Sequence, residues 1–166
     1  MLWIKTFFGI LFQTLLLGIF LYLPALTLNW PDALLFLTVH FLITILASAY
    51  LLIVKPASIE ARMNYDSKTQ PKEDRLATVL MLSAIVVGLS LAPMDIFHVN
   101  LSSSFDGYIK NIGLGLYIFG MLLVMASMNA NEFAETTVNI QEGRGQKVID
   151  KGIYSLIRHP MYTGFI

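Results

Sequence analysis

The sequence predicts an all-α integral membrane protein with four transmembrane helices and the start of a fifth. Hydrophobic residues make up 56% of the 166 residues and charged residues 13%, against about 45–50% and about 25% in soluble domains. The charges are also unevenly distributed, because four long runs carry none: 6–31, 33–54, 76–94 and 111–131. A helix needs about 20 apolar residues to cross a bilayer core about 30 Å thick, and each run reaches that length.

The spans are expected at about 6–28, 33–54, 76–93 and 111–131. The first apolar run is longer than the core of a signal peptide, which favours a retained helix that ends in a turn before Asp32. Strands of a membrane barrel would alternate polar and apolar residues, and these runs do not. We therefore divide the chain into a four-span bundle, 1–131, and a short cytosolic cofactor-loop segment with the start of a fifth span, 132–166.

Composition excludes several classes of function. The net charge is zero and the sequence has no basic stripe, which argues against a nucleic-acid partner. The absence of cysteine excludes disulfides, thiolate nucleophiles and cysteine-type zinc sites. The three histidines, at 40, 98 and 159, are too far apart for an HExxH motif, and we expect no metal site.

Lysine and arginine predict the orientation in the membrane. Segment 55–75 carries five of these residues and segment 132–166 carries four, whereas 29–32 carries none and 95–110 carries only Lys110. Because basic loops stay on the cytoplasmic side, both basic segments and both termini are expected in the cytoplasm. Four spans are an even number, so the two expectations agree.

A few residues inside the spans are unusual for a lipid environment. Gln13 and His40 either mark a functional pathway or form an interhelical hydrogen bond, and the second interpretation is favoured. Ala84, Gly88 and Ala92 are spaced four apart, which predicts a face where another helix approaches the third span closely.

The most informative local pattern is Arg158-His159-Pro160. A residue before proline is pushed out of the helical region, and proline is favoured at the first position of a helix. We therefore expect a non-helical His159 and a fifth helix that begins at Pro160. The free N–H groups of that first turn, beside two basic side chains, suit an anion such as a carboxylate or phosphate. A basic boundary at the membrane surface is the alternative.

The expected fifth helix is short. Pro160 to Ile166 covers roughly 10 Å at 1.5 Å per residue, which is too little to cross a bilayer. We therefore expect the chain to be an incomplete form of a longer protein, without activity by itself.

These residues resemble a known family. GQKVIDKGIYSLIRHPMYTG (Gly145 to Gly164) is similar to the cofactor-binding signature of the isoprenylcysteine carboxyl methyltransferases, which are related to the phospholipid methyltransferases. Weaker similarity extends to NEFAETTVNIQ (Asn131 to Gln141), to EARM (Glu60 to Met63) and to the stretch from DRL (Asp74 to Leu76) to APMD (Ala92 to Asp95). The closest resemblance is to bacterial members.

The resemblance implies S-adenosylmethionine as methyl donor, bound at the cytosolic edge of the membrane. By position, the residues that would bind the cofactor are Gln146, Lys147, Val148, Gly152, Tyr154, His159, Pro160, Tyr162 and Gly164. Arg158, His159 and Tyr162 would be the catalytic residues. The implied partners are the bilayer and a lipid-like methyl acceptor, and the implied location is a bacterial inner membrane, or the endoplasmic reticulum in a eukaryote.

The chemistry of methyl transfer limits which methyl acceptor is expected. A prenylcysteine-type carboxylate is already ionised at pH 7, whereas an amine such as that of phosphatidylethanolamine must first lose a proton. No base is clearly placed in the sequence, which favours a carboxylate or thiolate. Two rival functions stay open: an NADPH-dependent membrane reductase, because sterol reductases carry a similar motif, and a non-catalytic membrane scaffold.

Overall fold

The computed structural model describes residues 1–63, 72–102, 106–131 and 148–165. Four long helices account for most of this chain: α1 (Leu2–Ala25), α2 (Pro31–Val54), α4 (Lys72–Met94) and α5 (Gly107–Ala130). All four have the length and apolar composition to cross a membrane. The expected all-α, four-span class is confirmed, and the described residues form no strand.

Short elements connect and extend these helices. They are α3 (Pro56–Met63), the π-helical turn η2 (Asp95–Val99), the 3₁₀ turn η4 (Gly152–Ser155) and α6 (Pro160–Phe165). The helix boundaries differ from the expected spans by a few residues, most at α1, which begins at Leu2 and ends at Ala25. The chain leaves α1 through Leu26 in the left-handed conformation, after Pro24 in the last turn, and Pro31 then begins α2.

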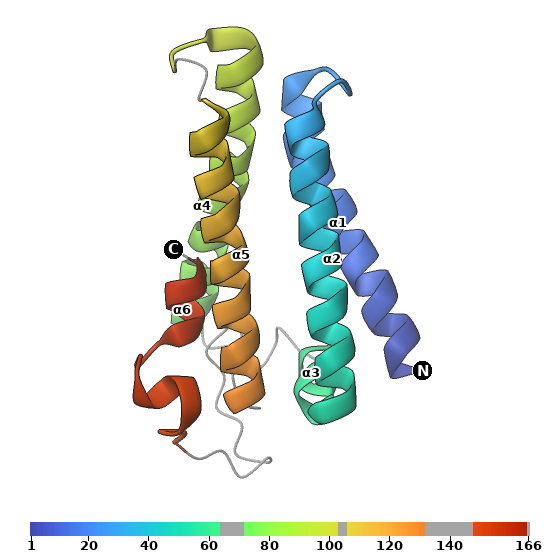
Figure 1. Ribbon diagram of the computed structural model, residues 1–166, viewed down its shortest axis with the longest axis vertical. Helices are drawn as coiled ribbons and strands as arrows, with labels where there is room; N and C mark the ends of the chain where they lie inside the picture. Colours follow the sequence, from blue (N-terminus) through green and yellow to red (C-terminus); the bar gives the residue numbers. More distant parts are fainter. Residues whose placement is uncertain (64–71, 103–105, 132–147, 166) are drawn as a thin grey trace.

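The helices pack as neighbours along their lengths (Figure 1). α1 lies against α2 and α4, and α5 lies against α6. α3 and η4 both lie at the lower end of the bundle in Figure 1, near the N-terminus, whereas the α1–α2 turn and η2 lie at the upper end. α3 and η4, which belong to the two segments richest in lysine and arginine, therefore lie at the same end of the bundle.

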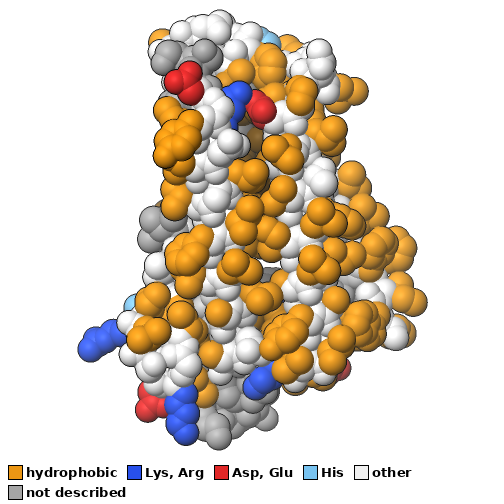
Figure 2. All heavy atoms as spheres, viewed as in Figure 1, with side chains coloured by type: hydrophobic (Ala, Val, Ile, Leu, Met, Phe, Trp, Pro, Cys, Tyr) orange, Lys and Arg blue, Asp and Glu red, His pale blue; other side chains and the backbone are white. Residues whose placement is uncertain are grey.

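The outer surface of the bundle is apolar. Large side chains along all four long helices are exposed, such as Phe12 at 68% and Leu46 at 68%. Figure 2 shows hydrophobic side chains over the middle of the molecule and charged ones at its two ends. This distribution fits a bilayer, because lipid tails are as apolar as these side chains and the helices do not have to bury them against one another.

The small-residue face expected on the third span has no partner helix among the described residues. Ala84, Gly88 and Ala92 are exposed on α4, and a Cβ built on Gly88 would meet no atom within 4 Å. A stripe of small residues allows close approach but requires a partner helix on that face. In the described chain the close approach lies instead between α5 and α6.

Candidate active site

The candidate site is built on the C-terminal half of α5. η4 and α6 both pack against this helix. Gly152, the first residue of η4, lies next to Ala130 at the end of α5, where a Cβ on Gly152 would be 3.6 Å from that of Ala130. Gly164, near the end of α6, lies against Gly120. The segment therefore runs from the end of α5 back along its surface, towards the middle of the bundle.

The Gly120–Gly164 contact is made by backbone alone. A Cβ on Gly164 would lie 2.6 Å from the carbonyl oxygen of Gly120 and 2.9 Å from Cγ2 of Val124. Such distances leave no room for any side chain. Pro160 and Met161 are buried in the same interface, so α6 is held by its first residues as well as by its last turn.

The residues between η4 and α6 form the helix entrance that the sequence predicts. Arg158 and His159 are not helical, and the six-residue helix α6 begins at Pro160. The non-helical His159 and the helix start at Pro160 are therefore as expected, whereas the interpretation of this helix as the start of a fifth membrane span stays a prediction. The carbonyl oxygen of His159 accepts hydrogen bonds from the amide of Thr163 at 3.0 Å and from its hydroxyl at 3.1 Å. This carbonyl therefore belongs to the first turn of α6, and the turn fixes the backbone of His159.

The structure brings two of the expected catalytic residues together. The His159 and Tyr162 rings lie 5.9 Å apart, centroid to centroid, at an angle of 38°. Both side chains are exposed, as is Arg158. The result is a pair of exposed aromatic rings, preceded in the chain by an exposed cation, on a segment whose backbone is held against α5.

The remaining expected residues differ in their surroundings. Tyr154 is half-buried in η4, and Val148 is 93% exposed. Gln146 and Lys147 lie outside the described residues. Their expected roles stay predictions.

The sequence analysis missed the supporting residues on α5. Ser127 is fully buried and donates its hydroxyl proton to the carbonyl oxygen of Leu123 at 2.7 Å, so it packs without an unpaired polar atom. Gly120 could have been noticed in the sequence, because a glycine inside a helix lowers its stability and often marks a position where another segment packs closely. Nothing in the sequence said which segment would lie against it.

His40 forms the interhelical hydrogen bond that was the favoured interpretation. Its Nδ1 atom pairs with the hydroxyl of Tyr117 on α5, and His40 is buried. Phe36 packs against the same tyrosine, 4.8 Å between ring centroids. Gln13 is exposed on α1. The polar pair links α2 to α5 within the span.

Fold and site together define a multi-pass membrane protein with a basic, aromatic segment returning into the bundle beside α5. Residues 109–166 match the family model described as phospholipid methyltransferase. This segment includes nearly all of α5, η4 and α6, and the match agrees with the resemblance of the sequence to the isoprenylcysteine and phospholipid methyltransferases. Comparison with curated proteins and with solved structures gave no match. The family match favours a membrane methyltransferase over a membrane reductase.

Proposed function

We propose that this chain is a membrane methyltransferase that uses S-adenosylmethionine to methylate a lipid-like acceptor at the cytosolic membrane face. The observation that carries the proposal is the position of the family-matched segment. In this segment the rings of His159 and Tyr162 lie near one another, and the exposed Arg158 directly precedes His159 in the chain. The preceding turn, η4, lies at the end of the bundle that also carries α3 (Figure 1). We propose that this end faces the cytoplasm of a bacterial inner membrane.

The side chains present fit the proposed cofactor by their chemistry. S-adenosylmethionine, when bound, supplies a methyl group on a positively charged sulfur. Arg158 is an exposed guanidinium, which suits the carboxylate of an amino acid. The rings of Tyr162 and His159 suit a purine and a sulfonium, since aromatic faces attract cations. Gly152 and Tyr154 would complete the protein wall on the η4 side.

The acceptor that fits best is a carboxylate on a lipophilic molecule, such as a prenylcysteine. Transfer breaks one carbon–sulfur bond and forms one carbon–oxygen bond, and the ionised carboxylate supplies the electron pair without losing a proton. The protein then has to align the reactants and exclude water, which can supply a large part of the acceleration. A phospholipid amine, as the family description suggests, is the second candidate, and it requires a base.

Binding of radiolabelled S-adenosylmethionine to the detergent-purified chain tests the proposal. Arg158→Ala should weaken binding by about tenfold or more, since a hydrogen bond to a charged group contributes about 1.5–3 kcal/mol. His159→Ala should also weaken it. Lys151→Ala, which removes an exposed cation outside the helix entrance, is the matched control and should leave the affinity unchanged.

Two further measurements separate the rival functions. Methyl transfer is assayed with a prenylcysteine analogue and with phosphatidylethanolamine as acceptors. The sequence leads us to expect no turnover by the chain alone, and wherever transfer occurs the first acceptor should be preferred. The same chain is tested for binding of NADPH. Binding of NADPH without binding of S-adenosylmethionine would replace the methyltransferase with a reductase. Absence of both would favour a non-catalytic scaffold.

A further inference from the structure

A second site lies at the opposite end of the bundle from α6. A cavity of about 710 Å³ lies between the first turns of α2 and α5 and the junction of α4 with η2. This volume falls within the range of about 300–1,000 Å³ that is usual for small-molecule sites. The family-matched helix entrance adjoins the other end of α5, so the cavity takes no part in the chemistry proposed above.

The inner part of the cavity is apolar. Leu35 and Phe36 come from α2, Ala92 and Ile96 from the α4–η2 junction, and Leu114 from α5. The ring of Phe36 packs on Tyr117, which separates the cavity from the His40 hydrogen bond one turn further down α2. The inner part can therefore pack against an acyl chain, but it has no side chain that would bind a charged group.

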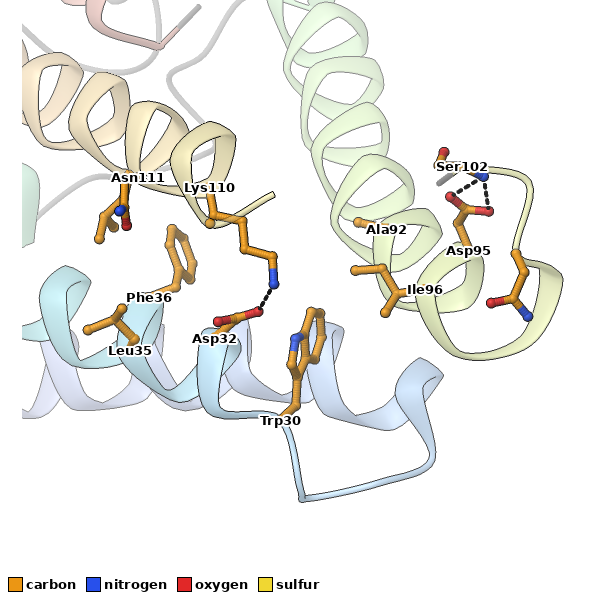
Figure 3. Close-up of a pocket in the computed structure, with 13 residues that line it drawn as sticks. Trp30, Asp32, Leu35, Phe36, Ala92, Asp95, Ile96, Ser102, Lys110 and Asn111 are labelled. Carbon is orange, nitrogen blue, oxygen red and sulfur yellow. Dashed lines mark hydrogen bonds and ion pairs between the residues drawn. The ribbon is translucent and has the colours of Figure 1, made fainter. Parts of the chain in front are cut away.

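The rim of the cavity carries charges of both signs (Figure 3). Lys110 of α5 and Asp32 of α2 form an ion pair at 2.6 Å, and each side chain is about half exposed, at 50% and 55%. Both point across the gap between their helices, and Trp30 stands beside Asp32. Ion pairs as exposed as this contribute little to stability, so a ligand can share or replace the contact.

The spacing along each helix joins the rim to the inner part. Phe36 follows Asp32 by four residues and Leu114 follows Lys110 by four, so each apolar residue lies one turn below a charged one on the same face. Trp30 is held by Phe97 at 5.2 Å between ring centroids, and tryptophan prefers the headgroup level of a membrane. A molecule that is polar at this level and apolar below it matches the cavity.

The charges of Asp32 and Lys110 determine which lipid headgroup the cavity can bind. A phosphate meets the ammonium of Lys110, whereas an ammonium meets the carboxylate of Asp32 and the ring of Trp30. Asp95 also lines the cavity, but its carboxylate accepts hydrogen bonds from the backbone amides of Leu101 and Ser102 (Figure 3). Asp32 and Lys110 therefore offer a headgroup one negative and one positive charge, which matches a head that carries one charge of each sign. We propose that this cavity binds one zwitterionic phospholipid. Its head lies on the Asp32–Lys110 pair and part of one acyl chain between Leu35, Phe36 and Leu114. The bound lipid is held rather than methylated.

Native mass spectrometry of the delipidated, detergent-purified chain tests this proposal. The probes are phosphatidylcholine, phosphatidylglycerol and a cationic lipid with identical acyl chains. Phosphatidylcholine should bind most tightly, with a stoichiometry of one. Ala92→Phe places a ring in the cavity and should weaken binding about tenfold, the effect of displacing about two methylene groups. Ala84→Phe, at an exposed position of the same helix, should have no effect.

A labelling experiment makes the site assignment independent of the variants. Phosphatidylcholine with a diazirine near the start of one acyl chain should label peptides that contain 31–36 and 110–114, and Lys110→Gln should reduce this label. Equal affinity for all three lipids, an Ala92→Phe chain that binds as the wild type does, or label confined to other segments would each overturn the proposal. Circular dichroism of each variant shows whether its helices are intact.

Discussion

The carbonyl oxygen of Gly164 lies 2.5 Å from the position that a Cβ atom on Gly120 would occupy. The reverse contact, from Gly164 to the carbonyl oxygen of Gly120, is equally close at 2.6 Å. Two backbones can approach this closely only if neither residue has a side chain. The contact fixes α6 on α5, and with it the positions of His159 and Tyr162.

Substitution of Gly120 should therefore displace α6. We expect Gly120→Ala to destabilise the chain by about 1–3 kcal/mol, the usual cost of inserting a methyl group into a packed interface. It should also weaken binding of S-adenosylmethionine, because the helix entrance moves with α6. Thermal unfolding in detergent and a binding assay measure the two effects.

Gly113→Ala is the matched control for this experiment. Gly113 lies on the same helix, and a Cβ there would meet no atom within 4 Å. Alanine is the better helix former, so this variant should be as stable as the wild type or more stable. Equal behaviour of the two variants would show that α6 does not rest on Gly120.

The sequence predicts features that depend on neighbouring residues better than contacts between residues far apart in the chain. The four long helices follow from uncharged runs of bilayer length, and the start of α6 follows from Pro160, whose ring restricts His159 directly. The Gly120–Gly164 contact joins residues that are 44 positions apart. Small residues at helical spacing occur on α4 as well as on α5, and only the structure shows which of them has a neighbour.

The same limit applies to the polar residues. The sequence identifies His40 as a buried hydrogen-bonding group, because an intramembrane histidine needs a partner, but it does not identify Tyr117. The Asp32–Lys110 pair joins residues 78 positions apart. Its position over an apolar cavity depends on how α2 and α5 lie relative to α4. The second site was therefore not predictable from local patterns.

Removing the tyrosine hydroxyl should weaken the contact between α2 and α5. In Tyr117→Phe the His40 ring loses the partner of its Nδ1 atom, while its Nε2 atom already lacks one among the described residues. Hydrogen bonds between membrane helices contribute about 0.6 kcal/mol on average and up to about 1.7 kcal/mol. We expect a loss near the upper value, measured by reversible unfolding in mixed micelles.

Tyr108→Phe provides the comparison for this loss. Tyr108 lies on the same helix and is 77% exposed, so its hydroxyl can remain solvated after folding. This variant should unfold as the wild type does. A double variant, His40→Phe with Tyr117→Phe, should recover part of the loss, because it removes both polar groups. A Tyr117→Phe chain of unchanged stability would argue against the hydrogen bond.

The turn before the helix entrance depends on the backbone of Gly152. Its φ angle is +63°, a left-handed conformation that costs other residues about 1–2 kcal/mol. Gly152→Ala should therefore destabilise the chain by about this amount, although space for the methyl group exists beside Ala130. Gly152→Asn should cost less, because asparagine tolerates this conformation. Equal stability of the alanine and asparagine variants would point to a cause other than backbone conformation.

The orientation in the membrane gives the last prediction. The described parts α3 and η4 of the basic segments 55–75 and 132–166 lie at one end of the bundle, and the Asp32–Lys110 pair lies at the other end. Because the first end carries the excess of lysine and arginine, it should stay in the cytoplasm. Reporter fusions after residues 30, 65, 100 and 140 should then read outside, inside, outside and inside.

The fusion after residue 100 is decisive, because it follows η2 at the end opposite to α3. A cytoplasmic signal there would reverse the topology and would place the proposed active site on the outer face, where S-adenosylmethionine from the cytoplasm could not reach it.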